Sequence, residues 1–402
     1  MTAPRLPEFH VMAKPTGARC NLDCQYCFFL KKEQLYPGGT FRMSDEVMES
    51  YIRQTIAAHS VPEVTIAWQG GEPTLMGLDF FRRVVDVETA ALRPGMTVEN
   101  SFQTNGVLLD DEWCEFLHDN RFLVGLSVDG PREIHDAYRR DKAGRSVFDR
   151  VIGAARLMQK HEVEFNVLCT VNAVNSERPL DVYRFFRDDL KSSYVQFIPI
   201  VERDNDTGYQ EGTRVTDRSV RPEQYGRFLI EVFDEWVRRD VGKVFVQFFD
   251  GVLMSYVCGQ PSLCVLRPTC GESVALEHNG DVYACDHFVE PKHLLGNIAR
   301  TPLADLVSCD AQRAFGQAKA TTLPGQCRAC RWLFTCHGEC PKNRVLTTCD
   351  GEPGLNWLCA GLKAFFEHTE RPMKDMASLL QRGRYADEIM EAWQEDVPSA
   401  KA

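Results

Sequence analysis

The amino-acid sequence predicts an α/β protein: an open, partial (β/α)6 barrel of the TIM type, followed by a cysteine-rich C-terminal domain. Three observations predict this fold class. β-rich runs alternate with amphipathic helical patterns over residues 8–201, and the 16 cysteines gather near the two ends of the chain. The 402 residues are also enough for two or more domains with a sizeable core.

The six expected strands are rich in β-branched and aromatic residues and span residues 8–13, 63–68, 97–102, 122–128, 164–171 and 194–200. Amphipathic helices are expected between them, at residues 44–59, 79–92, 110–120, 146–161 and 179–190. Ser44 is the expected N-cap of the first helix, with Val47 and Tyr51 on its apolar face. Such repetition implies a parallel sheet with right-handed crossovers. Six units rather than eight favour an open barrel, and a doubly wound sheet is the alternative.

The remainder of the chain has a different organisation. Residues 202–222 carry charges, glycines, serines and threonines, which predicts a loop and a domain boundary. A helix is expected at 222–240, with a buried aromatic face formed by Tyr225, Phe228, Phe233 and Trp236. The predicted units are a barrel at 1–202, a connecting loop and helix at 203–257, a metal-binding domain at 258–365 and a helical tail at 366–402.

Composition excludes several classes of function. The net charge is -11 and no basic run is present, which argues against nucleic acid or an anionic membrane as the main partner. No apolar stretch approaches the roughly 18 residues of a membrane-spanning helix, and no signal-peptide pattern opens the chain. We therefore expect a cytoplasmic protein. Cysteines in a reducing compartment are more often metal ligands or catalytic groups than disulfides, and only Cys114 and Cys169, expected to be buried, lie between the two cysteine-rich regions.

Three cysteines, Cys20, Cys24 and Cys27, form a C-x3-C-x2-C pattern directly after the first expected strand. Thiolates so closely spaced can hold one metal centre on a single loop. Iron–sulfur clusters usually take four thiolates, so three leave one iron with an open position, as a catalytic metal site requires. The alternative is half of a zinc site, with Cys24 and Cys27 as a C-x2-C knuckle and distant residues completing it.

Most expected strands end in polar or glycine-rich residues. Strands two to five are followed by Gln69–Pro73, Gln103–Gly106, Ser127–Gly130 and Thr170–Asn172, whereas strand six ends in the apolar Ile198–Ile200. Active sites of such barrels lie at the C-terminal ends of the strands. The polar strand ends therefore predict a site at that end of the barrel.

Gly70-Gly71-Glu72-Pro73 is the next most specific motif. Two glycines allow the backbone to approach a ligand closely, and Glu72 offers a carboxylate to an ammonium group. The alternative is a tight turn that caps a helix start, with Pro73 in the first turn.

The second group of cysteines follows the spacing Cys327-x2-Cys330-x5-Cys336-x3-Cys340. Four further cysteines flank it in the sequence: Cys264, Cys270, Cys285 and Cys359. Asn279-Gly280 predicts a hairpin turn before Cys285. Eight thiolates suffice for two closed four-thiolate sites, which zinc or iron–sulfur clusters would both accept.

These motifs together resemble radical S-adenosylmethionine (SAM) enzymes, and the C-terminal pattern resembles their SPASM extension. More narrowly, the chain is similar to the anaerobic sulfatase-maturating enzymes over nearly its whole length. The resemblance rests on the cysteine loop with Tyr26, on Gly70–Pro73, and on residues 101–106, 127–134, 264–286, 295–298, 327–343 and 355–359. It implies SAM and three [4Fe–4S] clusters as cofactors.

The resemblance also implies the ligands of each cluster. Cys20, Cys24 and Cys27 would hold the SAM-binding cluster. The first auxiliary cluster would take Cys264, Cys270, Cys285 and Cys340, and the second would take Cys327, Cys330, Cys336 and Cys359. Cys349 is the rival to Cys359, while Cys258 and Cys309 match no ligand position.

Further site residues follow from the same resemblance. It places Gly70, Gly71 and Glu72 at the methionyl amine of SAM, Tyr26 near the adenine, and Ser127, Arg139 and Ile200 or Val201 against the rest of SAM. Read alone, Ser127 is equally a satisfied strand-end hydroxyl, and Arg139 an ordinary surface charge. Gln103 would help to place the substrate peptide, and Phe29 stands where many relatives have tyrosine.

Asp286, next to Cys285, would be the general base. Its alternative role is that of a hydrogen-bonded turn residue. The implied reaction oxidises a cysteine or serine of a sulfatase polypeptide to Cα-formylglycine. Two alternatives stay open: a related maturase of another ribosomal peptide, and a zinc-stabilised binding protein without catalysis.

The resemblance also carries expectations about partners. The implied electron donor is a ferredoxin or flavodoxin, and we expect a monomer. The sequence leaves open whether the substrate residue is cysteine or serine.

Overall fold

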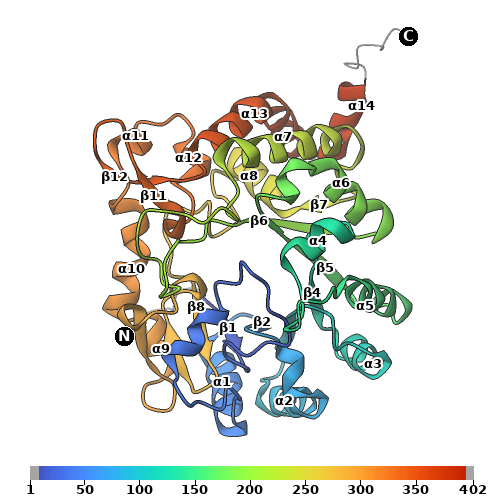
Figure 1. Cartoon of the computed structure of the whole chain (residues 1–402), viewed down its shortest axis with the longest axis vertical. Helices are drawn as coiled ribbons and strands as arrows, with labels where there is room; N and C mark the ends of the chain where they lie inside the picture. Colours follow the sequence, from blue (N-terminus) through green and yellow to red (C-terminus); the bar gives the residue numbers. More distant parts are fainter. Residues whose placement is uncertain (1–8, 395–402) are drawn as a thin grey trace.

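The computed structural model describes residues 9–394 and is built around a curved parallel sheet (Figure 1). The barrel strands are β1 (His10–Lys14), β2 (Glu63–Trp68), β3 (Thr97–Thr104), β4 (Leu123–Ser127), β5 (Phe165–Val171) and β6 (Tyr194–Pro199). They lie side by side in chain order, and each neighbouring pair is parallel. A doubly wound sheet reverses its strand order at a switch point. The partial barrel is therefore confirmed and the doubly wound alternative is wrong; Glu8, which opened the first expected strand, lies outside the described residues.

The helices that follow the strands lie outside the sheet (Figure 1) and are α1 (Asp45–Ala58), α2 (Leu78–Ala91), α3 (Asp111–Asp119), α5 (Phe148–Lys160) and α6 (Pro179–Arg184). Ser44 caps α1 as expected, because its Oγ accepts a hydrogen bond from the Val47 amide. The core between sheet and helices is aromatic, and Trp68 packs edge-on against Tyr51 with ring centroids 5.5 Å apart. The sequence pattern did not predict α4 (Arg132–Tyr138), which follows β4.

The C-terminal half extends the same sheet at the β1 edge. β8 (Ser273–Glu277) pairs in parallel with β1, and β9 (Asp281–Tyr283) and β10 (Leu294–Asn297) continue it as antiparallel strands. The expected hairpin turn lies between β8 and β9, where Gly280 has a φ of +90°. Because β8 runs in the same direction as β1, the hairpin turn that follows β8 lies at the same end of the sheet as the C-terminal end of β1. At the other edge, β7 (Phe245–Val246) pairs with β6.

The remaining elements cover the sheet edges and the C-terminal cysteines. They are α7 (Pro222–Arg239), α8 (Gln247–Cys258), α9 (Leu303–Val307), α10 (Asp310–Thr321), α11 (Gly325–Arg328), α12 (Leu333–Cys336), β11 (Arg344–Thr347), β12 (Pro353–Asn356), α13 (Cys359–Gln381) and α14 (Ile389–Gln394). The aromatic face of α7 is buried as expected. The helix packs closely on α13, since a Cβ on Gly361 would lie 1.9 Å from the Pro222 carbonyl oxygen.

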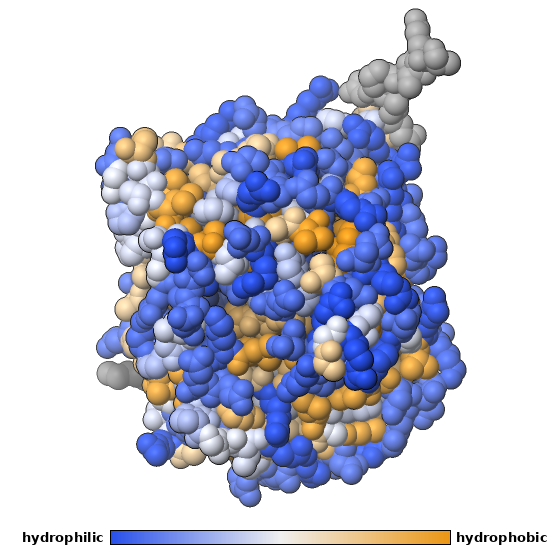
Figure 2. All heavy atoms as spheres, in the orientation of Figure 1, coloured by the Kyte–Doolittle hydropathy of each residue, from blue (hydrophilic) through white to orange (hydrophobic). Residues whose placement is uncertain are grey.

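Short 3-10 and π turns connect these elements: η1 (Leu30–Leu35), η2 (Pro73–Met76), η3 (Asn175–Glu177), η4 (Phe185–Asp189), η5 (Asp286–Phe288), η6 (Pro291–His293), η7 (Pro341–Asn343) and η8 (Ala386–Glu388). On the face shown in Figure 2, hydrophilic residues dominate the rim and apolar residues gather nearer the middle. Among residues 9–394, no helix combines the length and apolar character needed to span a membrane.

Candidate active site

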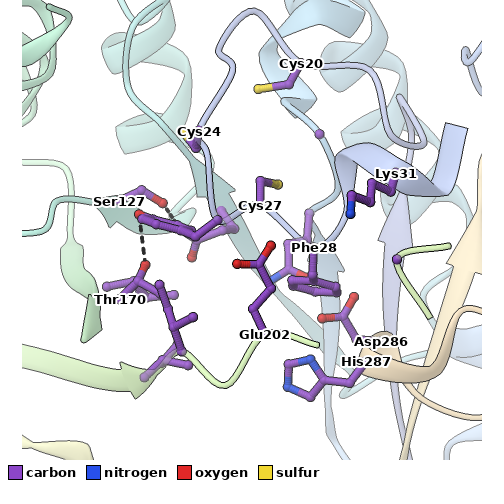
Figure 3. A pocket seen from close by; sticks show the side chains of 18 of the residues that line it. Cys20, Cys24, Cys27, Phe28, Lys31, Ser127, Thr170, Glu202, Asp286 and His287 are labelled. Carbon is purple, nitrogen blue, oxygen red and sulfur yellow. Dashed lines mark hydrogen bonds between the residues drawn. The ribbon is translucent and has the colours of Figure 1, made fainter. Parts of the chain in front are cut away.

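A cavity of about 290 Å³ lies at the C-terminal ends of the barrel strands. Residues within the C-terminal part of each of the six barrel strands, or in the segment that follows the strand, line it, as the polar strand ends predicted. The apolar end of β6 contributes as well, because Ile198, Pro199 and Ile200 form part of the wall. Figure 3 shows the three N-terminal cysteines at one end of this cavity and Asp286 with His287 at the other.

The cysteine loop after β1 brings Cys20, Cys24 and Cys27 to the cavity wall. Two backbone hydrogen bonds, from the Asp23 amide to the Arg140 carbonyl (2.9 Å) and from the Gln25 amide to the Tyr138 carbonyl (3.1 Å), tie this loop to the segment around the end of α4. Burial raises the pKa values of the Cys20 and Cys24 thiols to about 12. A metal that binds here must therefore displace thiol protons.

The two glycines after β2 give the cysteine loop a surface to pack on. The Gly71 amide donates to the Gly17 carbonyl at 2.8 Å, and the Glu72 amide donates to the Arg19 carbonyl at 3.0 Å. A Cβ on Gly71 would lie 1.9 Å from the Arg19 carbonyl oxygen. Gly70 has a φ of +122°, which favours glycine. Both glycines also line the cavity, so their lack of side chains serves the loop and the site together.

Glu72 is fully buried and is not part of the cavity wall. Its carboxylate accepts hydrogen bonds from the Thr74 hydroxyl (2.7 Å) and amide (3.1 Å), the Thr104 hydroxyl (2.8 Å) and the Asn105 amide (2.8 Å). Burial raises the pKa of Glu72. It caps η2, with Pro73 in the first turn. The capping interpretation of this motif therefore describes the turn after β2, and Glu72 also orders the end of β3. The expected contact of this motif with a cofactor stays a prediction.

A buried network connects the cysteine loop to β4 and β5. The Tyr26 hydroxyl donates to Asp129 at 2.5 Å, and the Arg139 guanidinium pairs with the same carboxylate at 3.0 Å. Arg139 also donates to the Thr170 hydroxyl at 3.0 Å and lies 5.4 Å from the centre of the Tyr26 ring. Arg139 is therefore not an ordinary surface charge. Tyr26, Arg139 and Thr170 all line the cavity.

Gln103 and Ser127 form a second polar contact on the cavity wall. The Gln103 amide donates to the Ser127 hydroxyl at 3.0 Å. Gly125 leaves room for this arrangement, because a Cβ there would lie 2.2 Å from the Gln103 amide oxygen. Ile200 and Val201 add buried apolar surface to the same wall.

Asp286 and His287 lie at the opposite end of the cavity, in the turn that follows Cys285. Asp286 forms an ion pair with Lys14, the last residue of β1. Burial by itself would raise the pKa of Asp286, but the Lys14 ammonium and neighbouring cationic groups bring it below its ordinary value. Burial lowers the pKa of His287 to about 3, so its imidazole is neutral at physiological pH.

Residues 202–218, here called the strap, cross beside the cavity after β6 (Figure 1). Lys31 and Lys32 of η1 donate to the Asn205 and Gly208 carbonyls at 2.8 and 2.9 Å. On the C-terminal side, Glu290 accepts from the Gln210 amide at 2.5 Å. Several strap residues line the cavity: Glu202, Arg203, Gly208, Tyr209 and Gln210. The segment expected to be a boundary loop thus forms part of the site.

The first C-terminal cysteine set lies together in space. Burial raises the pKa of Cys285 well above its ordinary value, and the nearby thiols of Cys340 and Cys264 add to the increase. Cys270 likewise raises the pKa of Cys340, which reaches about 12 mainly through burial. These four thiols therefore neighbour one another, although Cys340 is distant from the others in sequence.

The second set lines a cavity of about 30 Å³ formed by α11, α12 and the start of α13. Cys327, Cys330, Cys336 and Cys359 all face it. Cys349 is exposed and is not part of its lining. Within residues 9–394, no three His, Cys, Asp or Glu side chains are gathered as ligands of a single metal ion. A cluster is bound by thiolates on separate irons, so both cysteine sets suit a cluster in their donor type and number.

Comparison with known proteins identifies the family. The Radical SAM superfamily model matches residues 15–186, and the SPASM model, an iron-sulfur cluster-binding domain, matches residues 264–331. A serine-type anaerobic sulfatase-maturating enzyme of Bacteroides thetaiotaomicron is 43% identical, over 97% of this chain and 96% of that protein. A cysteine-type enzyme of Clostridium perfringens is 34% identical over 90% of this chain and 96% of its own length.

This chain belongs to the anaerobic sulfatase-maturating enzymes.

Solved structures of this family share the fold. Native anSMEcpe with bound AdoMet and Cp18Cys peptide superposes with a TM-score of 0.83 at 33% identity, covering 93% of this chain and 100% of that one. Radical SAM and SPASM domains use iron–sulfur clusters and SAM, so the expectation of these cofactors is confirmed for the family. The alternative interpretation, a zinc-stabilised binding protein without catalysis, is therefore wrong.

Several site residues of this family member were not singled out individually from the sequence. Asp129 and Thr170 complete the Tyr26–Arg139 network, yet each looks like an ordinary strand-end polar residue. His287 and Gln69 line the cavity beside motif residues that the sequence did single out. The sequence signal available for them was their position, since His287 follows Asp286 and Gln69 precedes Gly70. No local pattern points to the strap, since only the tertiary fold brings it to the cavity.

We predict that Gly71→Ala disrupts the cysteine loop, because the new Cβ would overlap the Arg19 carbonyl. Overpacking of this kind costs about 1–3 kcal/mol or moves the backbone. Iron content and visible absorbance after anaerobic reconstitution should both fall. Gly153→Ala on α5 is the matched control, since a Cβ there meets nothing within 4 Å. Full iron binding by Gly71→Ala would contradict this account of the motif.

Proposed function

We propose that this chain oxidises a cysteine or serine side chain of a sulfatase polypeptide to Cα-formylglycine and thereby activates the sulfatase. One observation carries the proposal: a single cavity joins the three N-terminal cysteines to Asp286, which directly follows the cysteine Cys285. The relatives named above are sulfatase-maturating enzymes, and anSMEcpe binds a peptide and AdoMet in the solved structure. These names favour a sulfatase over another ribosomal peptide.

The proposed cofactors are three [4Fe–4S] clusters and SAM. Cys20, Cys24 and Cys27 would hold the SAM-binding cluster, and the two C-terminal cysteine sets would hold one auxiliary cluster each. The grouping of Cys340 with Cys285, and of Cys359 rather than Cys349 with Cys336, supports these sets. When bound, these cofactors supply a 5′-deoxyadenosyl radical that removes a hydrogen atom and a redox centre that accepts one electron.

The residues around the cysteine loop are suited to binding SAM. Gly70 and Gly71 expose backbone groups beside the loop, where the methionyl amine would lie. Tyr26, Ser127, Arg139 and Ile200 line the remaining wall and would contact the rest of SAM. Glu72 would act indirectly, since its carboxylate holds the Asn105 amide at 2.8 Å. Gln103 would contact the substrate peptide or hold Ser127 in place.

The oxidation removes one hydrogen atom, one proton and one electron from the substrate. Asp286 would take the proton of the thiol or hydroxyl as general base. When bound, SAM would supply the radical that accepts the hydrogen atom of Cβ, and an auxiliary cluster would accept the electron. A serine gives the aldehyde directly, whereas a cysteine gives a thioaldehyde that water converts to the aldehyde with release of hydrogen sulfide. A base beside a cluster ligand suits a step in which proton and electron leave together.

The partners in this proposal follow from the same chemistry. Each reductive cleavage of SAM needs one electron, which a ferredoxin or flavodoxin would supply. We place the reaction in the cytoplasm because 16 cysteines suit a reducing compartment. One chain contains every proposed ligand, so a monomer suffices.

An anaerobic assay with short sulfatase peptides tests the proposal. Peptides that carry cysteine, serine or alanine at the modified position should be incubated with reconstituted protein, SAM and reductant. We expect mass spectrometry to show aldehyde formation from the cysteine peptide, the serine peptide or both, and none from alanine. SAM cleavage without aldehyde in either reactive peptide would contradict the proposed substrate class.

Asp286→Asn should lower formylglycine formation by about 100-fold or more, because general-base catalysis typically contributes 10²–10⁴-fold. The substitution preserves shape and leaves the three N-terminal cysteines untouched, so SAM cleavage should persist. Iron content is measured in parallel. Formylglycine formation at the wild-type rate, with full iron content, would reject Asp286 as the base.

A further inference from the structure

Lys14 is a buried cation that the proposed reaction does not use. It is 2% exposed and ends β1, immediately before the cysteine loop begins. Burying an ammonium is costly unless it is paired and hydrogen-bonded. Lys14 has three such contacts: the ion pair with Asp286, a 2.5 Å hydrogen bond to the Gln69 side chain, and the face of the Phe29 ring at 4.6 Å.

Those three contacts come from three different parts of the molecule. Gln69 follows β2, Phe29 follows the cysteine motif, and Asp286 belongs to the SPASM region. The parallel pairing of β1 with β8 places Lys14 opposite Glu277, at the base of the hairpin that leads to Asp286. Lys14 thus connects the barrel to the turn that carries the proposed base.

Lys14 and Asp286 differ in their exposure to the cavity. Lys14 contacts Oδ1. Asp286 lines the cavity whereas Lys14 does not. Among residues 9–394, the ion pair with Lys14 is the only one that Asp286 forms. This geometry allows Lys14 to fix the carboxylate from behind while Asp286 itself faces the cavity, where a substrate would present its proton.

Phe29 explains how the ammonium is kept in place. Phe29 stands where many relatives have tyrosine, so it lacks the tyrosine hydroxyl. Its aromatic face lies against the Nζ atom of Lys14. Phe29 is 3% exposed and is itself absent from the cavity lining. Cation–π contact and the Gln69 hydrogen bond restrict Nζ to one position, and that position holds the Asp286 carboxylate.

We infer that Lys14 is the positioning residue of this site, holding Asp286 at the cavity wall so that hydrogen-atom removal is followed by proton removal. This inference rests on the proposed function, in which Asp286 is the base. It concerns orientation and leaves SAM cleavage to the residues around the cysteine loop.

The test compares Lys14→Met with wild-type protein on a peptide deuterated at the reacting Cβ. We expect 5′-deoxyadenosine to form and to carry deuterium, since hydrogen abstraction does not need Asp286. The yield of formylglycine per 5′-deoxyadenosine should fall by about tenfold or more, because displacing a reacting group by about 1 Å can cost about 100-fold. A crystal structure of the variant should show the Asp286 carboxylate displaced.

Arg187→Met is the matched control, because Arg187 is a largely buried cation, 18% exposed, that pairs with Glu235 and Asp240 and does not line the cavity. Its formylglycine yield per 5′-deoxyadenosine should equal that of wild type. Lys14→Gln replaces Lys14→Met if the latter fails to bind iron.

A wild-type yield ratio in an iron-replete Lys14 variant, or an Asp286 carboxylate that stays in place, would overturn the inference. If wild-type protein forms no formylglycine from any peptide, the proposed function fails instead. In that case the position of the Asp286 carboxylate, compared between crystal structures of wild-type protein and the Lys14 variant, decides whether Lys14 holds it in place.

Discussion

The contact between the cysteine loop and the glycine end of β2 is the constraint on which the site depends. The loop backbone from Gly17 to Arg19 lies directly on Gly71, with no space for a side chain between them. Because Glu72 continues from that contact and binds Thr104 and the Asn105 amide, the loop is fixed to β2 and β3 together. Three thiols on an otherwise irregular segment thereby acquire defined positions at the barrel mouth.

The second consequence of the fold is that distant segments of the chain meet at the same mouth. β8 lies alongside β1, and the turn that follows its antiparallel partner β9 carries Asp286 to the cavity. The strap reaches the cavity from β6 and is bound on both sides, by Lys32 and by Glu290. Enclosure of this kind limits water around a reactive radical and strengthens electrostatic contacts inside the site.

Much of this organisation could be predicted from the sequence. The alternation of strands and helices predicted the barrel, and its polar strand ends located the cavity. Local patterns did not predict which groups a motif side chain contacts in the folded protein. The contact of Glu72 with an ammonium group stays a prediction, whereas its bonds to Thr74, Thr104 and Asn105 arise because the fold turns its side chain into the core. The pairing of Lys14 with Asp286 joins residues 272 positions apart, which no periodicity encodes. The cluster ligands and the base remain predictions, supported by the proximity that the fold creates.

SAM cleavage in a variant that lacks only the N-terminal thiols tests the central claim most directly. Wild-type protein, reconstituted and reduced without oxygen, should convert SAM to 5′-deoxyadenosine and methionine. The variant with alanine at Cys20, Cys24 and Cys27 should retain the iron of the C-terminal sites and form no 5′-deoxyadenosine. Cleavage by that variant, or none by iron-replete wild-type protein, would contradict the account.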